Sequence, residues 1–263
     1  MRARQYGFSL VELSIVLAII GLLTGGILAG RHMIRSAKLN SVVTEYNGHR
    51  NALNVFMDRY YSLPGDMPDA ESHWGTAINC PGTSAQPSTD ERTCDGNGSG
   101  YIIFNETANS NEVFRAWQHL ANAGLVEGKY TGVVGPGHAL FHSVPGENSP
   151  RSKFGNAGWN IRWLAGTADG NYTGDTRIFS GIYRNVLHFG GASNTELAMD
   201  PIITPEEAYE IDRKADDGKP AQGDVVVMYW GPCTDAADED DSTSDYDRAV
   251  TSESCSLVFR NLY

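Results

Sequence analysis

Hydrophobic residues are concentrated at the start of this chain. No charged residue occurs from Leu13 to Gly30, and an apolar helix of this kind can cross a membrane. Apolar residues then recur at three- and four-residue spacing as far as Tyr60, and the first proline is Pro64. This spacing is typical of an amphipathic helix. We therefore predict one helix over residues 9–61, whose first half lies in lipid and whose second half packs on a sheet.

The segment after this helix combines turns, a polar loop and one short helix. Residues 63–68 predict a turn, and residues 76–100 are rich in Gly, Ser, Thr, Pro and Asp, which indicates a loop. Asn109 and Glu112 form a capping-box pattern, which predicts a helix that ends near Gly124.

Residues that favour β-strands cluster in the second half of the chain. They predict strands over residues 159–164, 176–183, 185–189 and 224–230, and a final edge strand over residues 256–260. Between them, Thr204, Pro205 and Glu207 predict the start of a helix that ends near residue 215. This order predicts an α+β fold in which the long N-terminal helix packs on a mainly antiparallel β-sheet head.

One carboxylate, Glu12, lies near the start of the apolar run. An ionised side chain in hydrocarbon costs roughly 2.5–3.5 kcal/mol at a helix centre and less near an end, so Glu12 requires a partner. The next basic residue, Arg31, lies about 28 Å further along a helix that rises about 1.5 Å per residue. We therefore expect the partner of Glu12 on another molecule.

The segment GFSLVE at residues 7–12, preceded by a short basic leader, resembles the class III signal of type IV pilins and type II secretion pseudopilins. This resemblance covers about the first 60 residues. It implies that a prepilin peptidase cleaves after Gly7 and that the new N-terminal residue, Phe8, is methylated. It also implies that Glu12 neutralises the N-terminal amine of a neighbouring subunit, and that the helix melts locally around Thr24–Gly26 in a filament.

The resemblance implies an organisation and a function for the whole chain. Residues 1–7 are the leader, 8–61 the helix (8–30 transmembrane and 31–61 amphipathic), and 62–263 an extracytoplasmic head. The chain is then a single-pass protein of the bacterial inner membrane, with its head in the periplasm. It would become a subunit of a type IV pilus or type II secretion filament. Its expected partners are other pilin or pseudopilin subunits, the prepilin peptidase and an inner-membrane assembly platform.

Other interpretations remain open at this point. An ordinary secretory signal cleaved near Thr24–Gly26 or a plain membrane anchor also fits the apolar run, although neither explains Glu12 beside a Gly-Phe bond. A membrane-anchored, calcium-dependent adhesin or binding module is the alternative function. The net charge of −12 argues against binding nucleic acid. Phosphate-loop, nucleophile-elbow and zincin motifs are absent from the sequence, so we do not expect an enzyme.

Residues 95–106 reproduce the spacing of an EF-hand calcium loop. The candidate oxygen ligands are Asp95, Asn97, Ser99, the Tyr101 carbonyl and Glu106, with Gly100 at the sharp turn. The pattern departs from an EF-hand because a polar loop precedes Asp95 where a helix is expected. Glu112 could replace Glu106 as a ligand. The sequence therefore predicts either a calcium site or a plain turn built from Asp, Asn and Gly.

Four cysteines fall into two sequence-local pairs, and neither pair has metal-knuckle spacing. In an exported head they predict the disulfides Cys80–Cys94 and Cys233–Cys255. The acidic tract between the second pair, residues 235–247, predicts a solvated loop, with cation binding as the alternative. Asp212, Asp216 and Asp217 lie near a helix C-terminus, where the macrodipole disfavours negative charge, so we expect a structural role with a cation or a basic neighbour to compensate.

Overall fold

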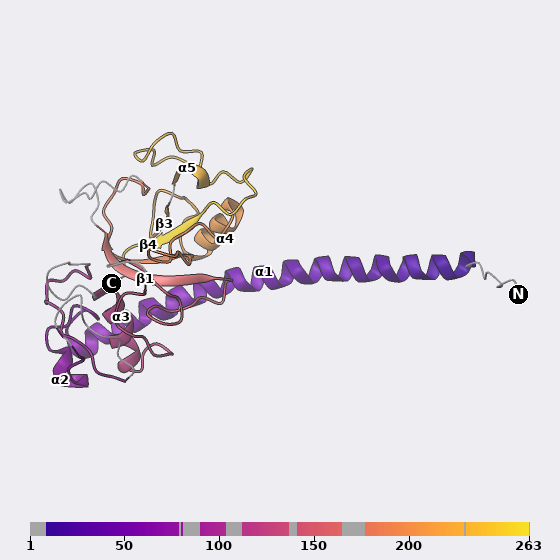
Figure 1. The fold of residues 1–263 in the computed structure, drawn as a ribbon. Coiled ribbons are helices and arrows are strands. Elements are labelled where there is room, and N and C mark those ends of the chain that lie inside the picture. Colours follow the sequence, from indigo (N-terminus) through magenta and orange to yellow (C-terminus); the bar gives the residue numbers. More distant parts are fainter. Residues whose placement is uncertain are drawn as a thin grey trace, which may run out of the picture.

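A computed structural model describes residues 9–78, 80, 90–103, 112–136, 141–164, 177–228 and 230–262. Its dominant element is helix α1, Leu10–Tyr60, which has 51 residues and is continuous. The N-terminal part of α1 projects away from the rest of the chain, and its C-terminal part runs along the head (Figure 1). The helix ends at Tyr61, which adopts a left-handed conformation with φ 53° and donates its N–H to the Met57 carbonyl. The predicted long helix is therefore confirmed.

In the described part of the head there are four shorter helices. They are α2 (Ala70–Trp74), α3 (Glu112–Asn122), α4 (Pro205–Ala215) and α5 (Trp230–Cys233). Helix α4 begins with the predicted capping box, because the Thr204 side chain accepts from the Glu207 N–H and Glu207 accepts from the Thr204 N–H. Helix α3 is present as predicted, but the proposed cap Asn109 lies outside the described residues.

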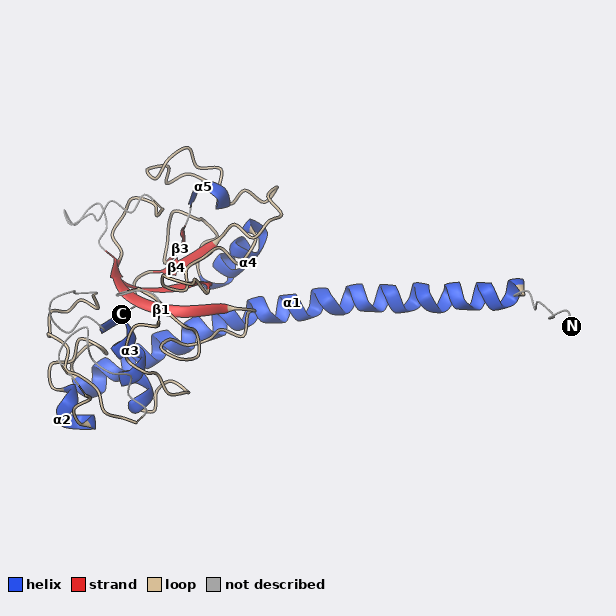
Figure 2. Ribbon diagram, viewed as in Figure 1, coloured by secondary structure: helices blue, strands red, loops and turns tan. Residues whose placement is uncertain are grey.

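Four strands of the described residues form one antiparallel sheet in the order β1-β2-β4-β3. The strands are drawn in red in Figure 2. The strands are β1 (Ala157–Leu164), β2 (Arg184–Gly191), β3 (Val225–Met228) and β4 (Ser256–Phe259). The long helix and this sheet confirm the predicted α+β fold, which fits a pilin-like arrangement.

Two predictions for the sheet are wrong. Strand β4 is not at an edge, because it pairs with β2 on one side and with β3 on the other, and all four of its residues are buried. A position at the end of the sequence does not determine a position in the sheet. The described residues 177–183 form no strand, and only Ile178 makes an isolated bridge, to Met228 of β3. Their apolar side chains, such as Phe179, enter the core from a loop instead.

Both outer edges of the sheet are covered by other parts of the head. Along β1, the Trp159 N–H donates to the Pro150 carbonyl at 3.0 Å and the Trp163 N–H donates to the Ile102 carbonyl at 2.6 Å. Along β3, the Val227 N–H donates to the Pro220 carbonyl at 2.9 Å, close to the Ile178 bridge. Backbone donors on both edges are therefore already engaged within the chain.

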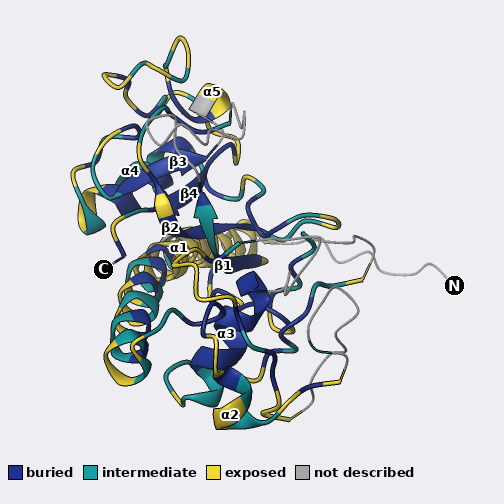
Figure 3. Cartoon of the chain, turned by 90° about the vertical axis from the view of Figure 1, so that its left-hand side faces the viewer, coloured by how far each residue is buried: buried dark blue, intermediate teal, exposed yellow. Residues whose placement is uncertain are grey.

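The core lies where α1 meets the sheet and α3. Tyr46 of α1 stacks on Phe259 of β4 with ring centroids 4.3 Å apart. One turn further, His49 contacts Trp117 of α3 and Trp159 of β1, with centroid distances of 5.0 and 5.2 Å. Strand and α3 side chains are mostly buried, while the projecting part of α1 is exposed (Figure 3). The second half of α1 is thus a structural element of the head.

Both predicted disulfides, Cys80–Cys94 and Cys233–Cys255, are present. Each closes a sequence-local loop, and the second joins the end of α5 to the residue before β4. Such cross-links stabilise a fold mainly by restricting the unfolded chain, by about 3 kcal/mol for short loops.

Candidate functional site

The projecting half of α1 has no protein surface to pack on. Its large apolar side chains are exposed, and Leu10, for example, is 85% exposed. Residues 10–30 extend for about 31 Å at about 1.5 Å per residue, which matches a hydrocarbon core of about 30 Å. By length and composition this is the one candidate membrane span among the described residues. So large an apolar surface requires lipid or other subunits around it.

This half contains four glycines, Gly21, Gly25, Gly26 and Gly30. Contacts within the described chain do not explain why glycine occupies these positions. A Cβ atom added at any of them would meet no heavy atom within 4 Å. The helix is continuous through Thr24–Gly26, where the Thr24 hydroxyl donates to the Ile20 carbonyl at 2.9 Å. The local melting that the resemblance implies for a filament stays a prediction. Small residues of this kind permit close approach of neighbouring helices.

Glu12 forms a capping box with Ser9 at the start of α1. The Ser9 N–H donates to Glu12 Oε2 at 2.8 Å, and the Glu12 N–H donates to Ser9 Oγ at 3.2 Å. This arrangement satisfies two of the free donors at a helix start and places a negative charge where the macrodipole favours it. Glu12 therefore has a local hydrogen-bond partner that the sequence analysis missed, but no counter-charge among the described residues. Its predicted pairing with a neighbouring amine stays a prediction, and Gly7 and Phe8 lie outside the described residues.

The Glu45 carboxylate of α1 makes three hydrogen bonds to the head. It accepts hydrogen bonds from the Ser152 hydroxyl at 2.6 Å, the Lys153 N–H at 2.9 Å and the Trp159 indole N–H at 2.8 Å. One helix side chain therefore satisfies three donors from the head.

Nearer the membrane-facing end, Arg35 pairs with Glu207 of α4. The bond to Glu207 raises the pKa of Arg35. Burial would raise the pKa of Glu207, but the bond to Arg35 and the cap of α4 together lower it.

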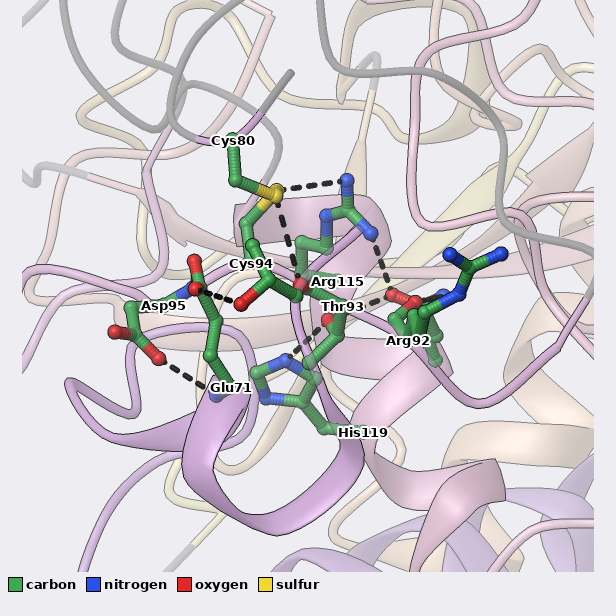
Figure 4. Close-up of a disulfide and its surroundings, with 10 residues drawn as sticks. Glu71, Cys80, Arg92, Thr93, Cys94, Asp95, Arg115 and His119 are labelled. Atoms are coloured by element: carbon green, nitrogen blue, oxygen red, sulfur yellow. Dashed lines mark hydrogen bonds between the residues drawn. A yellow bond between two sulfur atoms is a disulfide. The ribbon is translucent and has the colours of Figure 1, made fainter. Parts of the chain in front are cut away.

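The described part of the predicted calcium loop makes several internal hydrogen bonds. Asp95 Oδ1 accepts from the Glu71 N–H of α2 at 2.7 Å (Figure 4). Asn97 Oδ1 accepts from the Ser99 N–H at 2.8 Å, and the Ser99 hydroxyl donates to the Tyr101 carbonyl at 3.3 Å. Glu106 lies outside the described residues. Each described ligand oxygen thus has a partner within the chain, and calcium binding here stays a prediction.

Two buried acids outside residues 95–106 organise the backbone of this loop: Asp66, which was predicted only as a turn residue, and Glu112, which was predicted as the alternative ligand to Glu106. Asp66 is 2% exposed and accepts from the Ser99 and Gly100 N–H groups at 3.0 and 2.7 Å. Glu112 of α3 is 1% exposed and accepts from the Ile103 N–H at 3.0 Å. Burial raises the pKa of Glu112 to about 7, and the neighbouring charge of Asp66 acts in the same direction. Glu112 keeps its predicted place at the start of α3, but its side chain faces the loop.

A buried polar network lies beside the Cys80–Cys94 disulfide (Figure 4). Arg115 of α3 is 2% exposed and donates to Cys94 Sγ at 3.2 Å, and burial lowers its pKa to about 10. The Thr93 hydroxyl lies 2.9 Å from His119 Nε2, and His119 Nδ1 accepts from the Gly65 N–H at 3.0 Å. Burial lowers the pKa of His119 to about 3, so its ring is neutral at physiological pH. These contacts join α3, the loop and the end of α1 into one unit.

The acidic residues near the C-terminal disulfide are held by hydrogen bonds. Asp212 is fully buried and accepts from the Tyr246 hydroxyl at 2.7 Å and from the Gly218 N–H at 3.2 Å. Burial raises the pKa of Asp212 to about 7. Asp216 accepts from the Val225 N–H at 3.1 Å, and the carboxylates of Asp212, Asp216 and Asp217 lie within 4.8 Å of one another. Hydrogen-bond donors are therefore the compensating neighbours. In the tract 235–247, Asp235 Oδ1 accepts from the Asp245 N–H at 2.8 Å.

Comparison with known protein families gives one match. Residues 2–28 match the model of the prokaryotic N-terminal methylation motif, which is the prepilin-type signal of type IV pilins and pseudopilins. No curated protein and no solved structure matches the chain. The match covers the N-terminal signal alone and supports a precursor of the pilin or pseudopilin type, a class whose members are processed by a prepilin peptidase and assemble with other pilin subunits. The signal and the apolar helix together indicate membrane anchoring, and the motif favours a structural subunit over an enzyme.

Proposed function

We propose that this chain is a structural subunit, a pilin or pseudopilin, of a type IV pilus or a type II secretion filament. In this proposal the precursor is inserted in the inner membrane with its head in the periplasm. The peptidase cleaves after Gly7, and Phe8 becomes the methylated N-terminus. Head, helix and disulfides then enter the filament as one unit.

The observation that carries the proposal is the contrast between the two halves of α1. The second half is fixed to the head by buried side chains such as Val42 and Phe56, so it is part of a preformed fold. The first half, most of which lies within the methylation motif, exposes its apolar residues, and a Cβ atom added at any of its four glycines would meet no heavy atom within 4 Å. A helix with these properties suits transfer from lipid into a bundle of identical helices, because both surroundings are apolar.

In this mechanism, packing of apolar helix surface supplies most of the association. The role of Glu12 is to select the register between subunits. A carboxylate that enters an apolar bundle without a counter-charge is strongly disfavoured, so only an arrangement that offers it an amine is stable. The capping box with Ser9 orients the carboxylate at the helix start before assembly.

The test is the mass of the mature protein, measured on membranes and on filaments sheared from the producing bacterium. The proposal expects a chain that begins at a methylated Phe8 and that is present in the sheared fraction. A chain that begins near Ile27 would instead identify an ordinary secretory signal. An uncleaved chain that is absent from the filament fraction would favour the membrane-anchored binding module and refute a filament subunit.

A further inference from the structure

A groove lies at the point where α1 leaves the head. Its volume is about 470 Å³, and its walls come from α1, from the loop before β1 and from the segment before α4. The side chains that matter for its chemistry are Arg31, Ile34, Arg35, Lys38, Phe154 and Ile202. Basic groups and apolar groups therefore share one concave surface.

Two of the three basic residues in this groove have no partner in the part of the chain that the structure describes. Arg35 is neutralised, because it pairs with Glu207 and lies 3.5 Å from Glu253, with its guanidinium 5.3 Å from the centre of the Phe154 ring. Among the described residues, Arg31 and Lys38 make no ion pair or side-chain hydrogen bond. The groove thus carries excess positive charge on a protein whose net charge is −12.

The groove also lies at a defined depth. If residues 10–30 cross the hydrocarbon core, Arg31 is at its boundary, and the polar layer beyond it is about 5–8 Å thick. Lys38 lies about 10 Å further along the axis, but helix side chains tilt toward the N-terminus, which here means toward the membrane. Both cations can therefore reach the layer of lipid phosphates.

The position of these cations has a further consequence. Basic residues close to a membrane span are disfavoured on the side to which the protein is translocated. In the proposed orientation, Arg31 and Lys38 are on that side. A counter-ion in the groove offsets this disadvantage. The carboxylates of Glu207 and Glu253 lie on Arg35, so they leave Arg31 and Lys38 without a counter-ion among the described residues.

We propose that this groove binds the head group of one anionic phospholipid while the subunit resides in the membrane. The phosphate lies between Arg31 and Lys38, and the glycerol backbone contacts Ile34, Phe154 and Ile202, while the acyl chains lie along the membrane-spanning part of α1. The inference rests on the proposed function, because it requires α1 to span the membrane. The lipid would then be a ligand that the subunit either releases or carries with it on entering a filament.

The experiment uses the full-length, unassembled chain in a non-ionic detergent. Native mass spectrometry measures how many molecules of phosphatidylglycerol or phosphatidylcholine remain bound as each lipid is titrated. We expect one phosphatidylglycerol to bind more tightly than phosphatidylcholine. The double variant Arg31→Gln, Lys38→Gln is expected to bind phosphatidylglycerol about thirtyfold more weakly, from the usual contribution of two basic residues at an anionic surface. Its binding of phosphatidylcholine is expected to stay the same.

The matched control removes the same charge elsewhere. Lys129 and Arg184 are exposed and lie outside the groove, so Lys129→Gln, Arg184→Gln should bind lipid like the wild type. Equal affinity for the two lipids, unchanged binding by the groove variant, or an equal loss in the control would overturn the proposal. A groove variant that binds lipid normally but no longer enters filaments would assign the groove to a neighbouring subunit instead. Because lipid binding is measured before assembly, this result is independent of whether filaments form.

Discussion

The roles of Ser9 and Glu12 can be separated by three substitutions at the start of α1. Glutamine at position 12 keeps the capping box, because an amide oxygen can still accept from the Ser9 N–H, but it removes the charge. Ser9→Ala removes the other half of the box and keeps the charge. Glu12→Leu removes both the charge and the side-chain cap.

The expected magnitudes differ enough to be resolved. Loss of one N-cap side chain costs about 1 kcal/mol, which is about fivefold in an equilibrium constant. Removal of one partner from a buried ion pair costs about 3–5 kcal/mol, which is a factor of about 10² to 4 × 10³. If Glu12 pairs with an amine of a neighbour, Glu12→Gln should nearly abolish assembly, while Ser9→Ala should reduce it only slightly.

The assay is the ratio of subunit in sheared filaments to subunit in the inner membrane, by quantitative immunoblot. Membrane insertion should be unchanged in all three variants. Co-expression with wild type adds a second readout, because a Glu12→Gln chain still has an amine to offer to a wild-type neighbour and should be incorporated. Wild-type filament yield from Glu12→Gln, together with loss from Ser9→Ala, would show that Glu12 acts only as a cap and would refute the pairing mechanism.

Three further predictions concern the head, and all use the detergent-solubilised full chain. Glu45→Ala should lower the free energy of unfolding by about 3 kcal/mol, because it leaves the Trp159 indole N–H and other donors without an acceptor. The control Asp58→Ala, on the exposed face of α1, should change the free energy of unfolding by less than about 0.5 kcal/mol. Tryptophan fluorescence in urea measures both variants, and equal effects would contradict the role assigned to Glu45. The pKa of Glu112 is raised to about 7 in the folded chain, so between about pH 4.5 and 7 the folded chain keeps a proton that the unfolded chain loses. The stability that protonated Glu112 contributes is therefore lost as the pH rises through 7. Glu112→Gln should therefore gain up to about 3 kcal/mol relative to wild type between pH 5 and 7.5 in thermal or urea unfolding, and a parallel pH dependence of the two chains would contradict this. If the loop that begins at Asp95 binds calcium, millimolar calcium should give a heat of binding in calorimetry and raise the melting temperature. Asp95→Ala should abolish both effects. No response in the wild type would show that the loop does not bind calcium.

Local patterns in the sequence were sufficient for much of the fold. The boundaries of α1 and α4, the capping box at Thr204 and both disulfides depend on residues that are close together in the chain. In each case the physical signal, such as apolar spacing, a capping side chain or a short cysteine loop, is contained in one segment. Strands β1, β2 and β3 were found for the same reason.

What the sequence could not supply depends on contacts between distant segments. The central place of β4 follows from its pairing with β2 and β3, and no property of residues 256–259 encodes that order. Asp66 was predicted only as a turn residue, yet it accepts backbone donors from a loop 33 residues away. Arg35 and Glu207 are separated by 172 residues, and the groove that Arg35 lines exists only after α1 has packed on the head.

The covered edges of the sheet also limit how these heads can associate. An exposed strand edge is a template on which another chain can add a strand, and crowding of many copies makes such additions more probable. Here Pro150, Ile102 and Pro220 already occupy backbone donors along β1 and β3. Heads held at high local density can therefore slide and tilt against one another without fusing into a continuous ribbon. In the proposed filament, such protection suits growth by the orderly addition of subunits.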